Sequence, residues 1–394
     1  MPARRPRRVV SSSRTTVTVC LGRRRVFQDP VTLRKGAGDE HSDASAVAAA
    51  RGVCGVAAPG AQEVGVGARR AVLPESSAQN PLTVIDDAVR LAGRTAIRLA
   101  RGIPVVGNRF GAPPHLDLDG RVVFVTGAAR GLGAQIARQA HARGAQVVLV
   151  GRTLKPLEDL AAELGDGAAA FEADVTDAPA LRRAAEGAVA AFGGIDVVVA
   201  NAGIAPPSET VATIDPDEFE HTVEVDLLGQ WRTVRATLPA VIAARGHIAF
   251  VGSIYAFFNG VLAAPYAVSK AGVEQLSRAL RVELAQHGVT AGIAYLGFID
   301  TDLTSDAFAD EHAAAIRSAA PGFITRPMSA ESAAAAVLSG VERRAAQVTA
   351  PAWVGPVLAA RSLTTAVMDD VLMHNPRVSD AVLSAEDDVA QRDS

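Results

Sequence analysis

Tyr266 and Lys270 are the residues whose spacing points most clearly to chemistry. They stand four residues apart in Tyr266-Ala267-Val268-Ser269-Lys270, which puts a phenol and an ammonium on one face of a helix. The chain has three tyrosines and three lysines, so such a pair arises by chance with a frequency of about 0.02. A free tyrosine titrates at about pH 10. Because a neighbouring cation favours the phenolate, Tyr266 is a candidate proton donor and acceptor near neutral pH.

Ser253 supplies a third polar group to the same chemistry. It lies thirteen residues before Tyr266, directly after the apolar run 247–252, which is typical of a strand. Ligands of open α/β sheets bind at the carboxyl ends of the strands. The Ser253 hydroxyl is therefore a candidate to hold a substrate carbonyl oxygen while Tyr266 transfers the proton.

A glycine-rich turn near residue 127 indicates a dinucleotide site. The segment Thr126-Gly127-Ala128-Ala129-Arg130-Gly131-Leu132-Gly133 follows the first apolar run and opens a helical stretch. Glycines allow the tight turn and the close approach of a pyrophosphate, which then lies at the unpaired N–H groups of the helix N-terminus. We expect Gly127, Gly131, Leu132 and Gly133 to contact the cofactor, and Lys270 can hold its ribose hydroxyls.

Two arginines favour NADP(H) over NAD(H). After the second expected strand the chain reads Gly151-Arg152-Thr153, without the acidic residue that would bind a free ribose 2′-hydroxyl. Arg130, in the glycine turn, can converge on the same place. Guanidinium groups bind a 2′-phosphate through charge-assisted hydrogen bonds. The alternative is that both are ordinary surface arginines in an arginine-rich chain.

The elements that position these residues alternate along the chain. Apolar runs typical of buried strands occur at 122–126, 146–150, 168–172, 195–200, 247–252, 290–296 and 348–350. Helical patterns lie between them at 132–143, 157–164, 179–192, 217–245, 265–287 and 330–345. Repeated β-α units predict an α/β fold with a Rossmann-type, doubly wound parallel sheet. The run 246–269 lacks charges, but its Asn, Gly and Pro argue against a membrane span.

Taken together, these motifs resemble the classical short-chain dehydrogenase/reductase (SDR) family over residues 118–350. The resemblance rests on the glycine turn, on Asn201-Ala202-Gly203 after the fourth expected strand, and on Ser253, Tyr266 and Lys270. It implies hydride transfer between NADP(H) and a small-molecule carbonyl or alcohol. It also implies a homodimer or homotetramer built through the long helices that carry Asp226 and Tyr266. By the same resemblance, the cofactor would contact Asp174, Val175, Asn201, Ala202, Gly203, Tyr266, Lys270, Ile299 and Thr301.

Asp226 is the main departure from the family pattern. Where the family usually has an asparagine that holds a proton-relaying water, this chain reads Val225-Asp226-Leu227-Leu228-Gly229. Asp226 can still orient a water and is kept as a candidate catalytic residue. An ionised carboxylate near Lys270 would offset part of the lysine's effect on Tyr266 and move the pH optimum upward. A second departure is Leu296-Gly297 where Pro-Gly is common, which affects loop stiffness.

Composition and the segments on either side of the catalytic domain complete the prediction. With 49% hydrophobic and 21% charged residues, a wholly disordered or fibrous protein is excluded. Residues 1–80 are predicted to be disordered, and 81–117 to hold an amphipathic helix at 82–103 that packs on the protein or touches a membrane surface. Residues 351–394 read as a helical extension with a polar tail. Two cysteines and no metal-ligand pattern favour a cytoplasmic protein without metal, and nucleic acid is not expected as a partner.

The substrate is the least determined part of the prediction. Residues 303–328 are expected to form a mobile lid, and five aromatic residues are expected to form an apolar wall, which favours a lipophilic carbonyl compound. These residues are Tyr255, Phe257, Phe258, Phe298 and Phe323. Two alternatives stay open: an NADP-binding regulatory or scaffold protein with weak turnover, motivated by Asp226, and an enoyl-type reductase.

Overall fold

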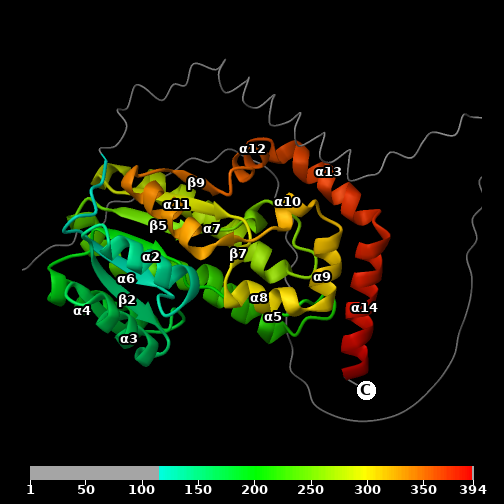
Figure 1. Cartoon of the computed structure of the whole chain (residues 1–394), viewed down its shortest axis with the longest axis horizontal. Coiled ribbons are helices and arrows are strands. Elements are labelled where there is room, and N and C mark those ends of the chain that lie inside the picture. The colour runs from blue at the N-terminus through cyan, green and yellow to red at the C-terminus, as the bar shows by residue number, and fades with distance from the viewer. Residues whose placement is uncertain (1–114, 393–394) are drawn as a thin grey trace, which may run out of the picture. The chain divides into compact units, whose positions relative to one another are not determined.

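The computed structural model describes residues 115–392, apart from the side chains of residues 306–308. The predictions for 1–80 and for the helix 82–103 lie outside the described residues. Seven parallel strands form the main sheet in the order β3-β2-β1-β4-β5-β6-β9 (Figure 1), which confirms the doubly wound fold. They are β1 (Val122–Thr126), β2 (Gln146–Gly151), β3 (Ala168–Glu172), β4 (Val197–Ala200), β5 (His247–Val251), β6 (Thr290–Leu296) and β9 (Gln347–Ala350).

Helices cover both faces of this sheet, which explains why its strands are apolar throughout. Val125, for example, pairs with Leu149 on one side and Val199 on the other, and all three side chains are fully buried. One hydrophobic cluster lies under α2 (Gly131–His141), α3 (Leu154–Leu164) and α11 (Ala330–Glu342). The other lies under α4 (Ala178–Phe192), α6 (Gly229–Ala243) and α7 (Ala264–Glu283).

The stretch 217–245 is helical as predicted up to residue 243, but a π turn divides it. The segment is α5 (Pro216–Val223), a π turn (Glu224–Leu228) and then α6. A π turn holds an extra residue and shifts the register of the helix that follows, and it occurs often at functional sites. The periodicity of the sequence does not reveal it because the helical backbone continues on both sides. Asp226 lies inside this turn.

Short elements near the C-terminus close one end of the sheet. The segment expected as a lid contains α8 (Asp302–Ala309), α9 (Glu311–Ser318) and α10 (Gly322–Thr325), with a two-stranded ladder of β7 (Ile299–Asp300) and β8 (Met328–Ser329) at its base. Three further helices follow β9: α12 (Val354–Ala359), α13 (Arg361–Met373) and α14 (Pro376–Arg392). Because α14 runs to Arg392, residues 386–392 of the expected polar tail are helical.

Helix α14 contacts both α9 and the loop after β4. It lies beside α9 (Figure 1), where His312 Nε2 and Asp388 Oδ2 are 3.0 Å apart. At its far end Arg392 Nη2 donates to Glu209 Oε1 at 2.9 Å, in the loop after β4. The C-terminal extension therefore connects α9, in the segment expected as a lid, to the loop after β4.

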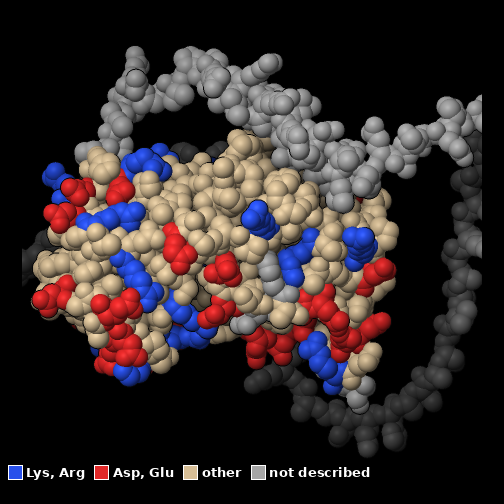
Figure 2. Space-filling view, in the orientation of Figure 1, with Lys and Arg blue, Asp and Glu red and all other residues tan. Residues whose placement is uncertain are grey.

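Charged and apolar side chains gather on different parts of the surface. Figure 2 shows acidic side chains gathered around α5, α8 and α14, and few charges over β9 and α12. Helices α6 and α7 expose the large apolar residues Trp231, Val268 and Val282, on the helices that the resemblance assigns to oligomer contacts; the oligomer itself stays a prediction. Among residues 115–392, no helix is long and apolar enough to cross a bilayer.

His247 gives the fold a testable dependence on pH. It begins β5, is fully buried, and lies 2.8 Å from Thr290 Oγ1 through its Nδ1. Burial, with a contribution from the charge of Arg344, lowers its pKa to about 3. The unfolded state, with a pKa of about 6.5, therefore binds the proton first as the pH falls, and stability declines below that value.

We expect this group to remove about 2 kcal/mol of unfolding free energy between pH 7 and pH 5. Denaturant titrations of the protein and of His247→Gln at both pH values measure the effect, since the variant lacks this contribution. His287→Gln, on an exposed helix end, is the matched control. An equal loss of stability in the parent protein and in His247→Gln would show that His247 titrates normally.

Candidate active site

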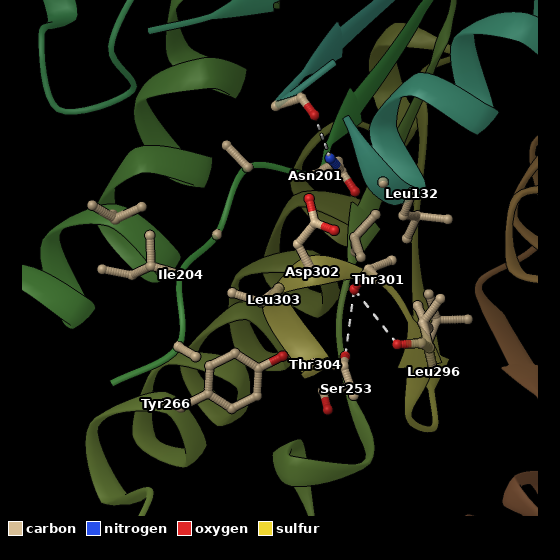
Figure 3. Close-up of a pocket in the computed structure, with 18 of the residues that line it drawn as sticks. Leu132, Asn201, Ile204, Ser253, Tyr266, Leu296, Thr301, Asp302, Leu303 and Thr304 are labelled. Atoms are coloured by element: carbon tan, nitrogen blue, oxygen red, sulfur yellow. Dashed lines mark hydrogen bonds between the residues drawn. The ribbon is translucent and has the colours of Figure 1, made fainter. Parts of the chain in front are cut away.

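A cavity of 590 Å³ opens at the carboxyl ends of the central strands. Figure 3 shows Leu132 and Asn201 at one end of it and Tyr266 and Ser253 at the other. Of the residues predicted from sequence, those that line it are Gly127, Arg130, Gly131, Leu132, Gly133, Arg152, Asp174, Val175, Asn201, Ala202, Gly203, Ser253, Tyr266, Lys270, Ile299 and Thr301. Asp226 does not line it.

The glycine turn has the geometry that a pyrophosphate requires. Gly127 and Gly131 have φ angles of +65° and +55°, which favour glycine. A Cβ on Gly133 would lie 2.1 Å from the Gly127 carbonyl oxygen, so no side chain fits there. Helix α2 begins at Gly131, and its N-cap Arg130 makes no side-chain cap, which leaves its first N–H groups for an anion. The residues therefore fit a dinucleotide.

Asn201 links the glycine turn to the neighbouring strand. Its Nδ2 donates to the Thr126 carbonyl at 2.9 Å, and its backbone N–H donates to Thr126 Oγ1 at 3.1 Å. Thr126 ends β1 and Asn201 follows β4, and these strands are adjacent in the sheet. The pair of bonds holds the floor of the cavity beneath the turn.

The two arginines predicted to converge differ in their contacts. Both line the cavity, but Arg130 Nη1 lies 3.3 Å from Asp302 Oδ2 at the start of α8, with both side chains about 70% exposed. An ion pair this exposed is weak. Arg152 is exposed and makes no hydrogen bond or ion pair with any residue of the described chain. The competing contact of Arg130 was not visible in the sequence because Asp302 is 172 residues away.

Tyr266 and Lys270 meet on α7 as their spacing predicts. Lys270 Nζ lies 5.0 Å from the centre of the Tyr266 ring, and Lys270 is almost fully buried. Ser253 follows β5, and its Oγ accepts from the Tyr255 N–H at 3.2 Å, which begins a short 3₁₀ turn. Burial raises the pKa of Tyr266, while the charge of Lys270 and a hydrogen bond with Ser253 act to lower it.

Asp226 lies beneath Lys270 as its buried counter-charge. Its Oδ2 is 3.1 Å from Lys270 Nζ, and its Oδ1 accepts from the Ile204 N–H at 2.7 Å. The Asp226 side chain is fully buried. Burial raises the pKa of Asp226 against the opposing effect of Lys270. Burial acts to lower the pKa of Lys270, but Asp226 and Tyr266 outweigh it, and the pKa is raised.

The expected aromatic wall forms only in part. Tyr255 and Phe298 line the cavity, and the Tyr255 ring lies edge-on to Tyr266 with centroids 5.5 Å apart. Phe257 is instead buried in the core, and Phe323 packs against a tryptophan that follows β9. Phe258 does not line the cavity either and stacks on the same tryptophan, Trp353. These three residues were misplaced because the side of a loop on which an aromatic residue lies depends on tertiary packing.

Sequence reasoning missed several residues that line the cavity, with Ile204 and Arg317 among them. Ile204 lines it while its backbone N–H holds Asp226, and Arg317 lines it from α9. The position of Ile204, directly after Asn201-Ala202-Gly203, was the available signal. Arg317 offered none, because it is one of many arginines in the chain.

Comparison with known proteins agrees with this geometry. A family model described as short chain dehydrogenase matches residues 121–312. A 3-oxoacyl-[acyl-carrier-protein] reductase, FabG of Salmonella typhimurium, is 32% identical over 207 residues, which cover 52% of this chain and 84% of the relative. The chain belongs to the short-chain dehydrogenase/reductase family. Nodulation protein G of a Rhizobium strain, another relative of this SDR protein, is 35% identical over 206 residues, 52% of this chain and 83% of the relative.

Solved structures support the same assignment for the SDR fold. A crystal structure of a 3-ketoacyl-(acyl-carrier-protein) reductase from Brucella melitensis, complexed with NADH, is 26% identical with a TM-score of 0.54. The match covers 59% of this chain and 97% of that one. The protein is thus an SDR oxidoreductase of the class that acts on carbonyl or alcohol groups with a nicotinamide cofactor.

The electrostatics of Asp226 can be measured by titrating the tyrosines. The charge of Asp226 raises the pKa of Tyr266. The other two tyrosines, Tyr255 and Tyr295, have pKa values raised to about 12, mainly by burial. We expect Asp226→Asn to lower the pKa of Tyr266 by roughly one unit, the low end of the range for one nearby charge. Ultraviolet absorbance of the phenolate reports it.

Two comparisons make this titration decisive. In a Tyr266→Phe background, Asp226→Asn should leave the remaining phenolate absorbance unchanged. Asp196→Asn removes a carboxylate just before β4 that is paired with Arg121, and the pKa of Tyr266 should stay as it is in the unchanged protein. A Tyr266 pKa that is identical with and without the Asp226 charge would contradict the assignment.

Proposed function

We propose that this protein interconverts a carbonyl and an alcohol with NADP(H), and that Tyr266 is the general acid and base. The observation that carries the proposal is the meeting of Tyr266, Lys270 and Ser253 at one end of a cavity whose other end is the glycine turn. NADP(H), when bound, supplies the hydride in reduction and accepts it in oxidation. The glycine turn and the N-terminus of α2 would hold its pyrophosphate.

The chain's own residues handle the oxygen and the proton. In reduction, Ser253 donates a hydrogen bond that holds the substrate carbonyl oxygen, and the Tyr266 hydroxyl gives that oxygen a proton. Lys270 lies close enough to stabilise the phenolate that Tyr266 becomes. In oxidation the same phenolate takes the proton from the alcohol. A general acid or base in such a position contributes about 10² to 10⁴ in rate.

Asp226 is a positioning residue in this proposal, because it touches Lys270 and not the cavity. Its carboxylate holds the lysine ammonium in place and keeps it protonated. The same charge raises the pKa of Tyr266, so the phenolate needed for alcohol oxidation forms at higher pH. Reduction, which needs the protonated phenol, is favoured at neutral pH by this arrangement.

An NADP-binding protein with weak turnover is the second candidate, and the buried Asp226–Lys270 pair is the observation that favours it. If the pair weakens the effect of Lys270 on Tyr266 too far, efficient turnover would be present only in Asp226→Asn. Efficient turnover in the protein without this substitution would instead favour the first candidate, the oxidoreductase.

The names of the relatives, several of them 3-oxoacyl-[acyl-carrier-protein] reductases, support a lipophilic carbonyl compound as the substrate.

Preference for NADP(H) rests on Arg152 and Arg130. Arg152 is exposed and lines the cavity directly after β2. At the position where an acidic residue would bind a free ribose 2′-hydroxyl, this chain has no acidic residue. Arg130 can leave its weak, exposed pair with Asp302 for a 2′-phosphate. Two guanidinium groups near one phosphate give a strong charge-assisted contact.

The catalytic assignment is tested by Tyr266→Phe. Removing the hydroxyl removes the proton donor, so we expect kcat for carbonyl reduction to fall by about 10² to 10⁴. NADPH binding, followed by nucleotide fluorescence, should persist and shows that the variant folds. Tyr295→Phe removes a buried hydroxyl outside the cavity and is the matched control. Full turnover in Tyr266→Phe would contradict the mechanism.

The cofactor assignment is tested separately with Arg152→Ala. We expect the ratio of kcat/KM for NADPH to that for NADH to fall by about tenfold or more, since one charge-assisted contact is worth about 1.5 kcal/mol or more. Arg182→Ala, on the exposed side of α4, should leave the ratio as it is. An unchanged ratio in Arg152→Ala, or equal use of the two nucleotides by the unchanged protein, would refute the two-arginine argument.

A further inference from the structure

A second cavity, of 310 Å³, adjoins the first. The two share a wall made of Ile254, Tyr255, Val261, Phe298, Ile316 and Arg317. The Tyr255 ring in this wall lies 5.5 Å from the ring of Tyr266, so the second cavity begins one side chain away from the proposed proton donor. Its far side is formed by α10 and α13.

The far side of the second cavity is apolar and is not filled by protein. Val367, Met368, Val371 and Leu372 of α13 line it, at the spacing of one helical face. None of the residues of α13 is buried, so these side chains lack the packing that apolar groups of a core obtain. An apolar lining of this kind favours an apolar ligand, because binding removes the exposed apolar surface from water.

Polar contacts fix the position of α13 against the rest of the chain. Arg361, at its start, makes two hydrogen bonds to the carboxylate of Glu274 on α7, at 2.6 and 2.9 Å. Asp369 accepts from Asn259 at 2.9 Å. Val354 and Val357 of the preceding α12 are buried, which anchors the extension to the core. The second cavity is therefore formed between residues of the family match, which ends at 312, and a larger set of residues beyond it.

We propose that the second cavity binds the apolar tail of the substrate, an unbranched alkyl or acyl chain whose carbonyl lies at Ser253 and Tyr266. The shared wall with the catalytic cavity favours this occupant over a separate ligand. If a methylene takes about the volume of a water molecule, ~30 Å³, the cavity holds about ten chain carbons. The inference rests on the proposed function and adds a chain-length preference to it.

The test is NADPH-dependent reduction of 3-oxoacyl thioesters of N-acetylcysteamine, graded from short to long acyl chains, by the full chain. We expect kcat/KM to rise by up to about fourfold for each added methylene, the effect of burying one such group. The rise should level off once about ten carbons occupy the cavity. Reduction of the short thioesters tests the proposed function on its own.

Variants of α13 locate the tail. Val371→Trp fills the second cavity, and we expect the ratio of kcat/KM for long over short thioesters to fall by about tenfold or more. Val367→Trp, one turn earlier, is a second variant of the same design should the first unfold. Met373→Trp adds the same side chain at an exposed position outside both cavities and should keep the ratio.

Three results would overturn the proposal. A flat chain-length profile with normal reduction of short thioesters rejects the tail site while leaving the proposed function standing. A profile that Val371→Trp and Val367→Trp both leave intact places the tail elsewhere. A preference for long chains that emerges only after Ile85→Asp and Val89→Asp would show that the chain's own segment 82–103 occupies the cavity.

Discussion

Parallel strand pairing is the constraint on which this site depends. Parallel hydrogen bonding puts the carboxyl ends of all strands at one edge of the sheet. Thr126, Asn201 and Ser253 are far apart in sequence, yet they follow or end the adjacent strands β1, β4 and β5. Helices α2 and α7 then approach this edge from opposite faces. Helix α2 provides the anion site at its N-terminus, and helix α7 carries Tyr266 and Lys270.

The buried pair of Lys270 and Asp226 shapes the chemistry at that edge. An ammonium taken out of water is costly unless a counter-charge and hydrogen bonds compensate it. Here the counter-charge comes from a π turn on the neighbouring helix, and the loop after β4 adds a backbone N–H through Ile204. Three separate segments thus cooperate to hold one lysine. The acid that stabilises Lys270 also raises the pKa of Tyr266, so positioning and proton affinity are linked.

The segments after β6 add helices and a short ladder to the common sheet. The lid helices and α12 to α14 are joined by contacts such as Arg361 with Glu274 and His312 with Asp388. Helix α13 makes polar contacts through Arg361 and Asp369, and its apolar face lines the second cavity. A core that carries nicotinamide-dependent chemistry is therefore combined with a C-terminal extension that lines the second cavity. The two can vary independently, because they share only a thin wall of side chains.

The amino-acid sequence by itself determined the doubly wound sheet, the glycine turn and the proximity of Tyr266 to Lys270. Apolar strand runs, glycine backbone requirements and helical spacing are local signals that need no knowledge of distant contacts. Even the seven strands of the sheet were located to within about two residues. The tertiary structure alone decided the π turn at Asp226, the pairing of Arg130 with Asp302, the inward burial of Phe257 and the second cavity. Each of these depends on residues far apart in the chain, whose meeting is set by packing and not by any pattern along the sequence.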